Sequence, residues 1–207
     1  MKHLAIFGAS GHGKVVADTA LQTAFWNSVS FFDDRWPNCK SNGQWDVVGG
    51  FSTLLDSLSS YQGVIVAIGD NKIRERLQLK LLNQGAKIVT IIHPSAYISP
   101  NKNIGNGTVI FANAVVNTDA IIGSGCIINT GATIDHDCQL DDFVHISPGA
   151  NIAGGVKIGA RSWVGIGSSI IQEVVVASDV IVGVGSTVIH NISASSTVVG
   201  SPAKNLN

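Results

Sequence analysis

Residues 122–151 read IGSGCI INTGAT IDHDCQ LDDFVH ISPGAN when the chain is divided into groups of six, and each group begins with an aliphatic residue. The same step of six continues over residues 98–188 without a gap or an insertion. All sixteen residues on this step are Ile or Val, except for one Leu. They are Ile98, Ile104, Ile110, Val116, Ile122, Ile128, Ile134, Leu140, Ile146, Ile152, Ile158, Val164, Ile170, Val176, Val182 and Val188. A fixed period of six residues is typical of a parallel β-helix.

Two further positions of each group also follow the six-residue period. The residue two places before the aliphatic is usually Ala, Cys or Ser, as at Cys126 and Cys138, and the residue after it is often Gly, Asn or Asp. We predict a triangular prism with three hexapeptides in each coil of 18 residues, whose inward aliphatic side chains stack at the ~4.8 Å spacing of parallel strands. The small residues would fill the corners. The Gly, Asn and Asp residues after each aliphatic would take the left-handed conformation that a corner needs.

Residues 1–94 carry most of the charged and aromatic side chains and alternate between apolar runs and helical patterns. The pattern predicts strands at residues 4–7, 29–32, 64–68 and 87–92, and helices at about 13–23, 51–59 and 73–82. Ser52 is the candidate cap of the second helix, and residues 35–50 are predicted to form a loop. This order indicates a small parallel sheet, half of a doubly wound Rossmann fold. We therefore expect two domains, residues 1–94 and residues 95–207, the second with a C-terminal tail.

The composition excludes several classes of protein. The net charge of −1 gives no electrostatic reason to bind nucleic acid or an anionic membrane. Three cysteines do not make a disulfide framework, and no apolar run approaches the roughly 18 residues of a membrane span. The Met-Lys-His start leads directly into the first predicted strand, so we expect no signal peptide and a cytoplasmic location.

The sequence GASGHG at residues 8–13 lies between the first strand and the first helix. Glycines there let a phosphate approach the backbone amides at a helix N-terminus, although a tight turn needed only for the fold would look the same. Asp33 lies about 20 residues further on, where NAD enzymes have the acid that binds ribose, so NAD is a rival ligand. Because only half a Rossmann sheet is predicted, a nucleoside diphosphate fits better.

His136 is the candidate catalytic residue. It lies between Asp135 and Asp137, two residues after the inward-facing Ile134, so it is expected near a corner and outside the core. A histidine flanked by carboxylates can be held in one tautomer and stabilised as imidazolium, which suits a general base at neutral pH. The alternative is a surface or interface histidine that is bonded to backbone.

Six motifs occur in order along the chain: GASGHG at residues 8–13, FFDD at 31–34, AIGDNKIR at 67–74, IHPSA at 92–96, the segment from Asn129-Thr130 to His136-Asp137, and GSPAK at 200–204. In these motifs the chain resembles the bacterial sugar-nucleotide N-acetyltransferases of the hexapeptide-repeat superfamily, which acetylate a UDP-linked 4-amino sugar as in bacillosamine pathways. Perosamine N-acetyltransferases and sialic acid O-acetyltransferases are relatives of this family. The resemblance implies a left-handed β-helix, a homotrimer, and acetyl-CoA bound in a groove between neighbouring prisms.

The resemblance also implies roles for individual residues. The N-terminal domain would bind the nucleotide sugar through Gly8, Ser10, Gly11, His12, Asp33, Asp34 and Asn71. His136 would be the general base, Asp137 would orient it, and the N–H of Gly154 would be the oxyanion donor. The family often has Glu where this chain has the shorter Asp137. Acetyl-CoA would be contacted by Asn129, His145, Gly154, Gly200, Pro202 and Lys204.

The sequence pattern also has to be weighed against a zinc enzyme, other acetyltransferases and a non-enzymatic scaffold. Gamma-class carbonic anhydrases are also left-handed β-helix trimers, but two of their zinc-binding histidines lie five residues apart in one chain. His136 and His145 are nine residues apart, so no metal is expected. An O-acetyltransferase acting on sialic acid or another sugar hydroxyl, and an N-acetyltransferase acting on a GDP- or dTDP-linked amino sugar, remain alternatives. A β-helix scaffold whose first domain senses NAD or a nucleotide is the non-enzymatic alternative.

Overall fold

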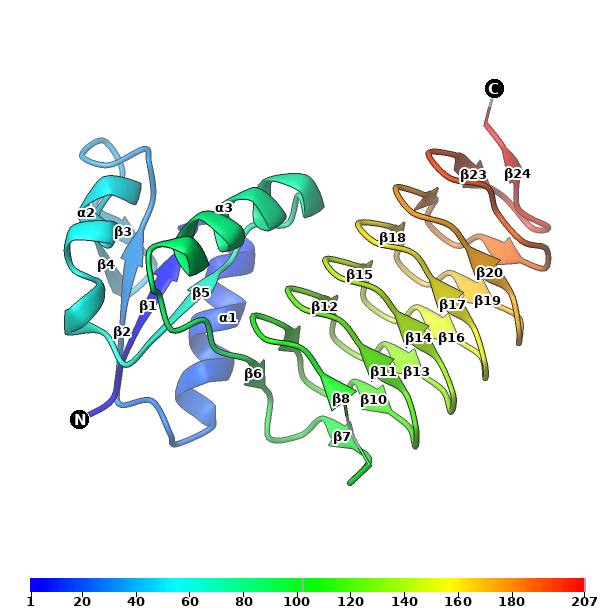
Figure 1. Cartoon of the computed structure of the whole chain (residues 1–207), viewed down its shortest axis with the longest axis horizontal. Helices are drawn as coiled ribbons and strands as arrows, with labels where there is room; N and C mark the ends of the chain where they lie inside the picture. The colour runs from blue at the N-terminus through cyan, green and yellow to red at the C-terminus, as the bar shows by residue number, and fades with distance from the viewer. Residues whose placement is uncertain (102, 207) are drawn as a thin grey trace. The chain divides into compact units, whose positions relative to one another are not determined.

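The computed structural model describes residues 1–101 and 103–206. The chain divides into two compact units, Met1–Pro94 and Ser95–Asn207. Figure 1 shows the first unit in blue to green and the coils of the second in green to red.

The first unit contains a five-stranded sheet with the order β3-β4-β2-β1-β5. The central strand β1 is parallel to β2 and β5, β4 is parallel to β2, and only β3 is antiparallel to its neighbour. This confirms the half of a doubly wound sheet. The strands of this sheet are β1 (His3–Phe7), β2 (Ser28–Phe32), β3 (Ser41–Asn42), β4 (Trp45–Gly49) and β5 (Gly63–Val66), and the short strand β6 (Ile91–Ile92) lies outside it. The helices are α1 (Gly11–Gln22), α2 (Phe51–Asp56), α3 (Asn71–Asn83) and the 3-10 helix η1 (Leu58–Ser60).

Three details of this unit differ from the sequence prediction. Residues 35–50 are not a loop, because they contain the hairpin of β3 and β4, and β4 adds a strand to the sheet. Its buried residues are Val47 and Gly49, whereas the apolar Val48 between them is exposed, so the sequence does not show the alternation of burial. Ser52 does not cap α2; instead the Oδ1 atom of Asp34 accepts a hydrogen bond from the N–H of Phe51 (2.8 Å). The predicted strand at residues 87–92 is reduced to a single bridge of Ile88 with Val64 and to β6.

The second unit is a parallel β-helix. Within the described residues, sixteen two-residue strands each end on one of the predicted aliphatic residues. Each strand pairs with strands 18 residues away, so that Ile134 lies between Val116 and Ile152. The strands are β7 (Tyr97–Ile98), β8 (Asn103–Ile104), β9 (Val109–Ile110), β10 (Val115–Val116), β11 (Ile121–Ile122), β12 (Ile127–Ile128), β13 (Thr133–Ile134), β14 (Gln139–Leu140), β15 (His145–Ile146), β16 (Asn151–Ile152), β17 (Lys157–Ile158), β18 (Trp163–Val164), β19 (Ser169–Ile170), β20 (Val175–Val176), β21 (Ile181–Val182) and β22 (Thr187–Val188).

Three sheets form the walls of the prism. The first runs from β7 through β10, β13, β16 and β19 to β22, and the second runs from β8 through β11, β14 and β17 to β20. The third contains β9, β12, β15, β18 and β21, followed by β23 (Thr197–Val199) and β24 (Lys204–Asn205). The antiparallel hairpin of β23 and β24 adds to the last strand of this wall.

The inward side chains form a continuous core. From Ile110 to Val188 every residue on the six-residue step is at most 2% exposed. The small residues two places earlier are buried as predicted, and the thiols of Cys126 and Cys138 donate to the carbonyls of Asp141 (3.2 Å) and Ala153 (3.1 Å). Burial of each aliphatic side chain favours folding by about 1.5–3 kcal/mol.

The prediction for the corners is wrong in one respect. The left-handed residues lie three places after each aliphatic, as at Asp137 (φ 59°) and Phe143 (φ 60°), and not directly after it. The residue directly after the aliphatic is often glycine because adjacent coils approach closely there. A Cβ atom on Gly123 would lie 2.6 Å from the backbone carbonyl carbon of Asp141. Packing between coils, and not backbone conformation, therefore selects glycine at this position.

Strand β11 offers a matched test of the stacked core. Ile122 is 1% exposed, whereas its neighbour Ile121 points outward and is 44% exposed. We expect Ile122→Ala to lower the free energy of unfolding by about 2–5 kcal/mol, because it leaves a cavity in the core, and Ile121→Ala to lower it by less than about 1 kcal/mol. Urea unfolding followed by circular dichroism measures both. Equal losses for the two variants would contradict the assignment of the inward face.

Candidate active site

The loop between β1 and α1 contains glycines with different roles. Gly8 has a φ of 115°, and a Cβ atom there would lie 2.5 Å from the carbonyl oxygen of Ala67. A Cβ atom on Gly13 would overlap the carbonyl oxygen of Gly8. Gly11 has neither constraint, because its φ is outside the left-handed region and no atom would lie within 4 Å of its Cβ. The fold thus requires Gly8 and Gly13, while Gly11 leaves open space in front of the helix.

The N-terminus of α1 faces that open space. Ser10 is its N-terminal flanking residue, with extended backbone and no capping hydrogen bond from its side chain, and the first turn has no acidic residue. The backbone N–H groups of the first turn have no intrahelical partners, and the helix dipole favours an anion beside them. The arrangement suits a phosphate group.

Asp33 and Asp34 follow β2 at the same edge of the sheet. Asp33 accepts a hydrogen bond from the N–H of Ala9 at Oδ2 (2.8 Å) and forms an ion pair with Arg35. Hydrogen bonds from the Arg35 side chain are the main reason that the pKa of Asp33 falls to about 2. Asp34 caps α2, as described above. Both carboxylates, which the family resemblance assigns to the substrate site, make these contacts within the protein.

Asn71 and His12 belong to a polar group at the ends of β5 and β1. The buried guanidinium of Arg74 donates to the side-chain oxygen of Asn71 (2.7 Å) and to the carbonyls of Ile68 (2.9 Å) and Gly69 (3.1 Å). Burial, with a smaller contribution from the charge of Arg74, lowers the pKa of His12 to about 4. His12 is therefore neutral at physiological pH and can both donate and accept hydrogen bonds. Arg74 was missed, although a charged residue on the apolar face of a helix was a visible signal.

His136 lies on an exposed corner of the β-helix between two carboxylates. Its Nδ1 atom is 2.7 Å from Oδ2 of Asp137, and its backbone N–H donates to Oδ1 of Asp135 (2.8 Å). The imidazole and the Asp137 side chain are 57% and 66% exposed. The hydrogen bond to Asp137, followed by the charge of Asp135, raises the pKa of His136. The shorter Asp therefore reaches the ring, helped by its left-handed backbone conformation (φ 59°).

Gly154 lies one coil beyond His136. Ile134 pairs with Ile152, and His136 and Gly154 lie two residues after Ile134 and Ile152, respectively. A Cβ atom on Gly154 would lie 2.6 Å from Cε1 and Nε2 of the imidazole, so only glycine leaves room for the ring. No hydrogen bond from the N–H of Gly154 occurs among the described residues. The imidazole of His136 and a backbone N–H group are thus adjacent on one corner.

Asp135 was not predicted as a site residue. Its Oδ1 atom also accepts a hydrogen bond from Nδ2 of Asn117 (2.9 Å), one coil earlier, and these contacts lower its pKa. The side chain therefore fixes the backbone of His136 and supplies a second negative charge near the ring. The sequence signal was its position beside the candidate base.

Asn129 and His145 lie on a different edge of the prism from His136. Nδ2 of Asn129 is 3.3 Å from Nε2 of His145, and the imidazole of His145 stacks on Trp163 with ring centroids 5.6 Å apart. Asn129 follows β12 in the third wall, whereas His136 follows β13 in the first wall. One chain therefore does not bring Asn129 and His136 to a common corner.

The tail at residues 200–204 is held against the last coil. The N–H of Gly200 donates to Oγ of Ser186 (3.2 Å), and the N–H of Ala203 donates to the carbonyl of Thr187 (2.8 Å). Gly200 follows β23 as Asn129 follows β12, so they lie along the same edge, four strand spacings apart. At ~4.8 Å for each spacing this is about 19 Å. Pro202 and Lys204 are exposed in this tail. Asn129, Gly200, Pro202 and Lys204 thus lie along one long edge of the prism, whereas Gly154, which was also predicted to contact acetyl-CoA, lies beside His136 on another edge.

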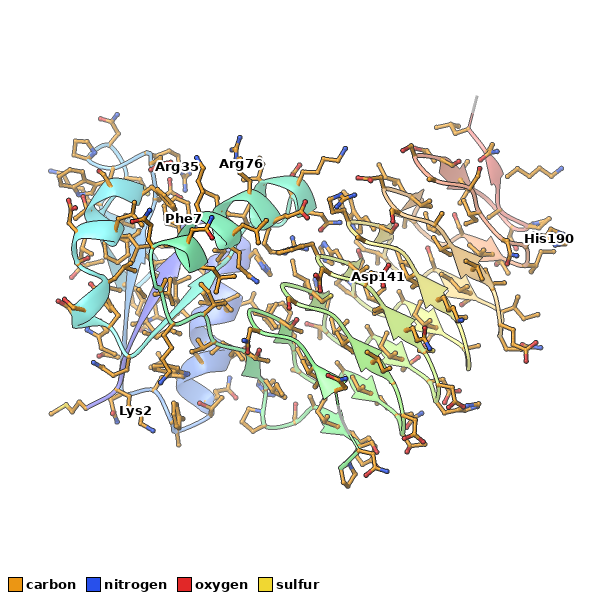
Figure 2. The ribbon with its side chains drawn as sticks, viewed as in Figure 1. Lys2, Phe7, Arg35, Arg76, Asp141 and His190 are labelled. Carbon is orange, nitrogen blue, oxygen red and sulfur yellow. The ribbon has the colours of Figure 1, made fainter. Side chains whose placement is uncertain are left out.

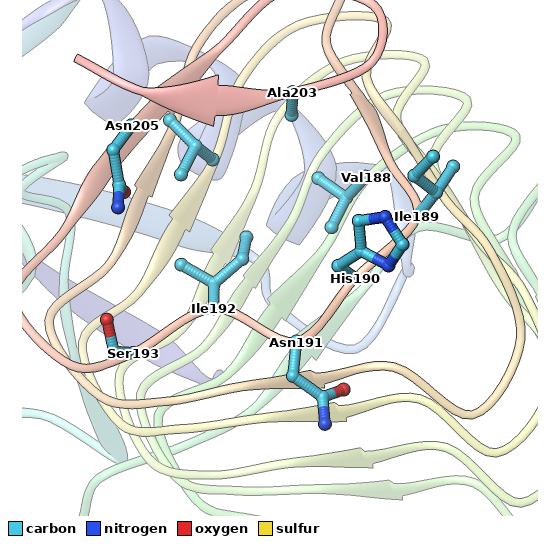
Figure 3. Close-up of a pocket in the computed structure, with 9 residues that line it drawn as sticks. Val188, Ile189, His190, Asn191, Ile192, Ser193, Ala203 and Asn205 are labelled. Atoms are coloured by element: carbon cyan, nitrogen blue, oxygen red, sulfur yellow. The ribbon is translucent and has the colours of Figure 1, made fainter.

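A small open pocket lies next to the tail (Figure 3). It has a volume of about 130 Å³ and is lined by residues 188–193 together with Val198, Ala203 and Asn205. Sites for drug-sized ligands occupy about 300–1,000 Å³, so this pocket is too small for a molecule of the size of CoA. Gly200, Pro202 and Lys204 do not line it.

Within residues 1–101 and 103–206, no group of three or more His, Cys, Asp or Glu side chains could hold a metal ion. No described helix combines the length and the apolar character that crossing a membrane requires.

Comparisons with known proteins extend over both units. Residues 3–81 match the family model described as the PglD N-terminal domain. The chain is 40% identical to the acetyltransferase domain of PglB from Neisseria gonorrhoeae FA1090, with a TM-score of 0.95 and coverage of 100% of both chains. The chain belongs to the sugar-nucleotide N-acetyltransferases of the hexapeptide-repeat family. The first unit is accordingly Rossmann-like and the β-helix of this family member is left-handed.

Other members of the family are similar over much or all of the chain. The same PglB domain in complex with acetyl coenzyme A is 42% identical over 99% of both chains, with a TM-score of 0.95. A histidine mutant of perosamine N-acetyltransferase from Caulobacter crescentus, in complex with CoA and GDP-perosamine, is 33% identical with a TM-score of 0.95 and covers 100% of this chain and 98% of that one. UDP-N-acetylbacillosamine N-acetyltransferase from Bacillus subtilis (strain 168) is 36% identical over 111 residues, and the match spans about half of each protein, 53% of this chain and 51% of that one.

Proposed function

We propose that this protein transfers the acetyl group of acetyl-CoA to the 4-amino group of a UDP-linked amino-dideoxy sugar of the bacillosamine type. The observation that carries the proposal is the imidazole of His136, fixed by Asp137 and lying against the bare backbone of Gly154. The similarity to the PglB acetyltransferase domain and to the Bacillus subtilis bacillosamine enzyme supports the sugar and the nucleotide. We also propose a cytoplasmic location.

His136 acts as the general base in this proposal. Asp137 accepts the Nδ1 proton, which leaves the lone pair of Nε2 free to accept a proton from the sugar amine. The amine nitrogen attacks the thioester carbonyl carbon, the tetrahedral intermediate collapses, and the C–S bond breaks. The CoA thiolate leaves and takes up the proton that His136 holds. The N–H of Gly154 stabilises the oxyanion of the intermediate.

Attack is direct, and no acyl-enzyme is required. A candidate thiol nucleophile, Cys138, is buried and its pKa is raised mainly by desolvation. Because the thiolate is the reactive form of cysteine, this thiol is unsuited to nucleophilic attack. His136 with its flanking carboxylates, together with the N–H of Gly154, supplies the catalytic groups that the proposal needs.

The donor site lies along the edge that carries Asn129, His145, Gly200, Pro202 and Lys204. Because His136 is on another edge of the same prism, a second prism must supply one of the two sets of residues. We therefore propose a homotrimer with acetyl-CoA between neighbouring prisms. Light scattering that shows an active monomer would contradict this assembly.

The acceptor site lies in the first unit at the carboxyl ends of β1, β2 and β5. The diphosphate binds at the N-terminus of α1, where Ser10 and Gly11 leave open space, and His12 and Asn71 border it. Gly8 shapes the loop, while Asp33 and Asp34 hold the surrounding backbone in place. In this arrangement the first unit selects the acceptor substrate, and the reaction takes place at His136 of the β-helix.

A GDP-linked amino sugar is the second candidate. It is favoured by the similarity of the chain to the perosamine enzyme over almost its full length. Acetyl-CoA turnover, with the released thiol detected, across UDP-, GDP- and dTDP-linked amino sugars and a sialic acid separates these candidates and the O-acetyltransferase alternative. Turnover of the hydroxyl acceptor alone would contradict N-acetylation.

The role of His136 is tested by substitution. We expect His136→Ala to lower kcat by roughly 10²–10⁴-fold, the usual contribution of a general base, while the fold and oligomeric state are retained. His190→Ala, which changes an exposed histidine near the end of the β-helix, is the control and should leave kcat within about twofold. Turnover of His136→Ala close to that of the wild type at neutral pH would overturn the assignment.

Asp137 controls the pH dependence. Because the hydrogen bond to Asp137 raises the pKa of His136, catalysis should fall as the pH decreases through a value above the ordinary 6.5. We expect Asp137→Asn to lower that pKa and to move the acidic limb of the kcat/KM profile to lower pH, with a lower maximum. Asp141→Asn, at an exposed position on the next corner, should not move it. An unchanged limb in Asp137→Asn would show that the contact does not tune the base.

Gly11 tests the acceptor site. A Cβ atom at this position would have no atom within 4 Å beyond its own neighbours and helix, so Gly11→Ala and Gly11→Val should fold normally but obstruct approach of the diphosphate. We expect KM for the nucleotide sugar to rise about tenfold or more in Gly11→Val and less in Gly11→Ala, with KM for acetyl-CoA nearly unchanged. Steady-state kinetics with each substrate varied in turn measures this. A parallel rise in both KM values would argue against separate sites.

A further inference from the structure

The side chain of Arg35 is fixed at the edge where the acceptor is proposed to bind. Its Nε atom donates to Oδ1 of Asp33 (2.8 Å), and its Nη2 atom donates to Oδ2 of Asp33 (2.9 Å) and to the carbonyl of Ala9 (2.7 Å). Figure 2 labels Arg35 in the first unit, on the segment that follows β2. The guanidinium thus joins the segment after β2 to the glycine loop after β1.

These contacts leave part of the guanidinium available to a ligand. The side chain is 60% exposed, whereas that of Asp33 is only 13% exposed. Nη1 of Arg35 makes no hydrogen bond within residues 1–101 and 103–206, so two N–H groups and the flat faces of the guanidinium can reach solvent. Because an exposed ion pair contributes little to stability, stability alone does not account for so many contacts.

Asp33 is poorly placed to bind the ligand itself. Each of its oxygens already accepts two hydrogen bonds from Arg35 or Ala9. In doubly wound sheets the loop after the first strand holds phosphate, and the residues after the second strand recognise the nucleoside. An acid there usually accepts hydrogen bonds from ribose hydroxyls. This chain instead presents donors and a planar cation at that position.

A planar cation suits particular parts of a nucleotide. Its N–H groups can donate to the carbonyl oxygens of uracil or guanine or to ribose oxygens, and its face can stack on the base. The neighbouring loop supplies the phosphate end of the same ligand, since Ala9, which is bonded to Arg35, lies two residues before the open position of Gly11.

We propose that Arg35 is the residue that recognises the nucleoside of the nucleotide sugar, through Nη1 and the face of its guanidinium, and that Asp33 holds this guanidinium in position and does not itself bind the ligand. The proposal rests on the proposed function, because it needs a nucleotide in the acceptor site. The competing role is a brace that only keeps the glycine loop in place.

Calorimetric titration of the intact protein with UDP and with GDP tests the proposal. Arg35→Lys distinguishes the two roles, because lysine keeps the ion pair with Asp33 but lacks the planar edge. We expect both Arg35→Ala and Arg35→Lys to bind the nucleotide about tenfold or more weakly than the wild type, with the melting temperature of Arg35→Lys unchanged. Arg76→Ala, which removes an exposed arginine from α3, should bind within about twofold of the wild type.

Each other outcome contradicts the proposal. Wild-type affinity in Arg35→Ala would show that Arg35 does not contact the nucleotide, and wild-type affinity in Arg35→Lys alone would show that it is only a brace. If the wild type binds neither UDP nor GDP, the nucleotide-sugar function itself fails, and that result is distinct from a loss confined to the Arg35 variants.

Discussion

The stacking of one coil on the next, 18 residues later, is the constraint on which the β-helix depends. Parallel hydrogen bonds fix the register, and the buried aliphatic side chains hold it, because a shift by one residue would turn them outward. Every outward position is then aligned with its equivalents in neighbouring coils. Gly154 therefore lies against His136, and Asn117 reaches Asp135, although each pair is 18 residues apart.

The strand-end loops of the first unit are held in position by a different kind of contact. Its glycine loop is fixed by close approaches of backbone, at Gly8 to Ala67 and at Gly13 to Gly8. Asp33 and Arg35 then connect the segments after β1 and β2, and Arg74 holds the segment after β5. These contacts use groups that would otherwise bind a ligand. The groups that remain open are the N-terminus of α1, Gly11 and the outer edge of Arg35.

The arrangement of the candidate groups explains why this family combines two units of different construction. A rigid ladder presents the base, its carboxylates and a backbone donor with little freedom, which favours an oriented attack. The strand-end loops of the Rossmann-like unit can vary in sequence without disturbing that ladder. Arg35 is an example, because it follows a strand of the first unit and its hydrogen bonds are with Asp33 and Ala9 of that unit.

How much could be predicted from the sequence differs between the two units. The six-residue period determined the β-helix, its sixteen strands and its inward residues, because strand pairing between adjacent coils repeats locally and needs no long-range information. The sequence also showed that carboxylates flank His136, since they are its neighbours in the chain. The hairpin of β3 and β4 was missed, because edge strands carry polar residues and their pairing depends on a partner elsewhere in the chain.

Only the tertiary structure decided which polar groups are hydrogen-bonded within the protein and which are open to a ligand. The sequence could not tell that Asp33 is saturated by Ala9 and Arg35, or that Asp34 caps α2, because a carboxylate has the same appearance whether it binds protein or ligand. It also could not show that Gly123 is required by packing and Gly11 is not. A glycine is selected by the atoms that surround it, and those atoms come from residues that only the folded chain brings near.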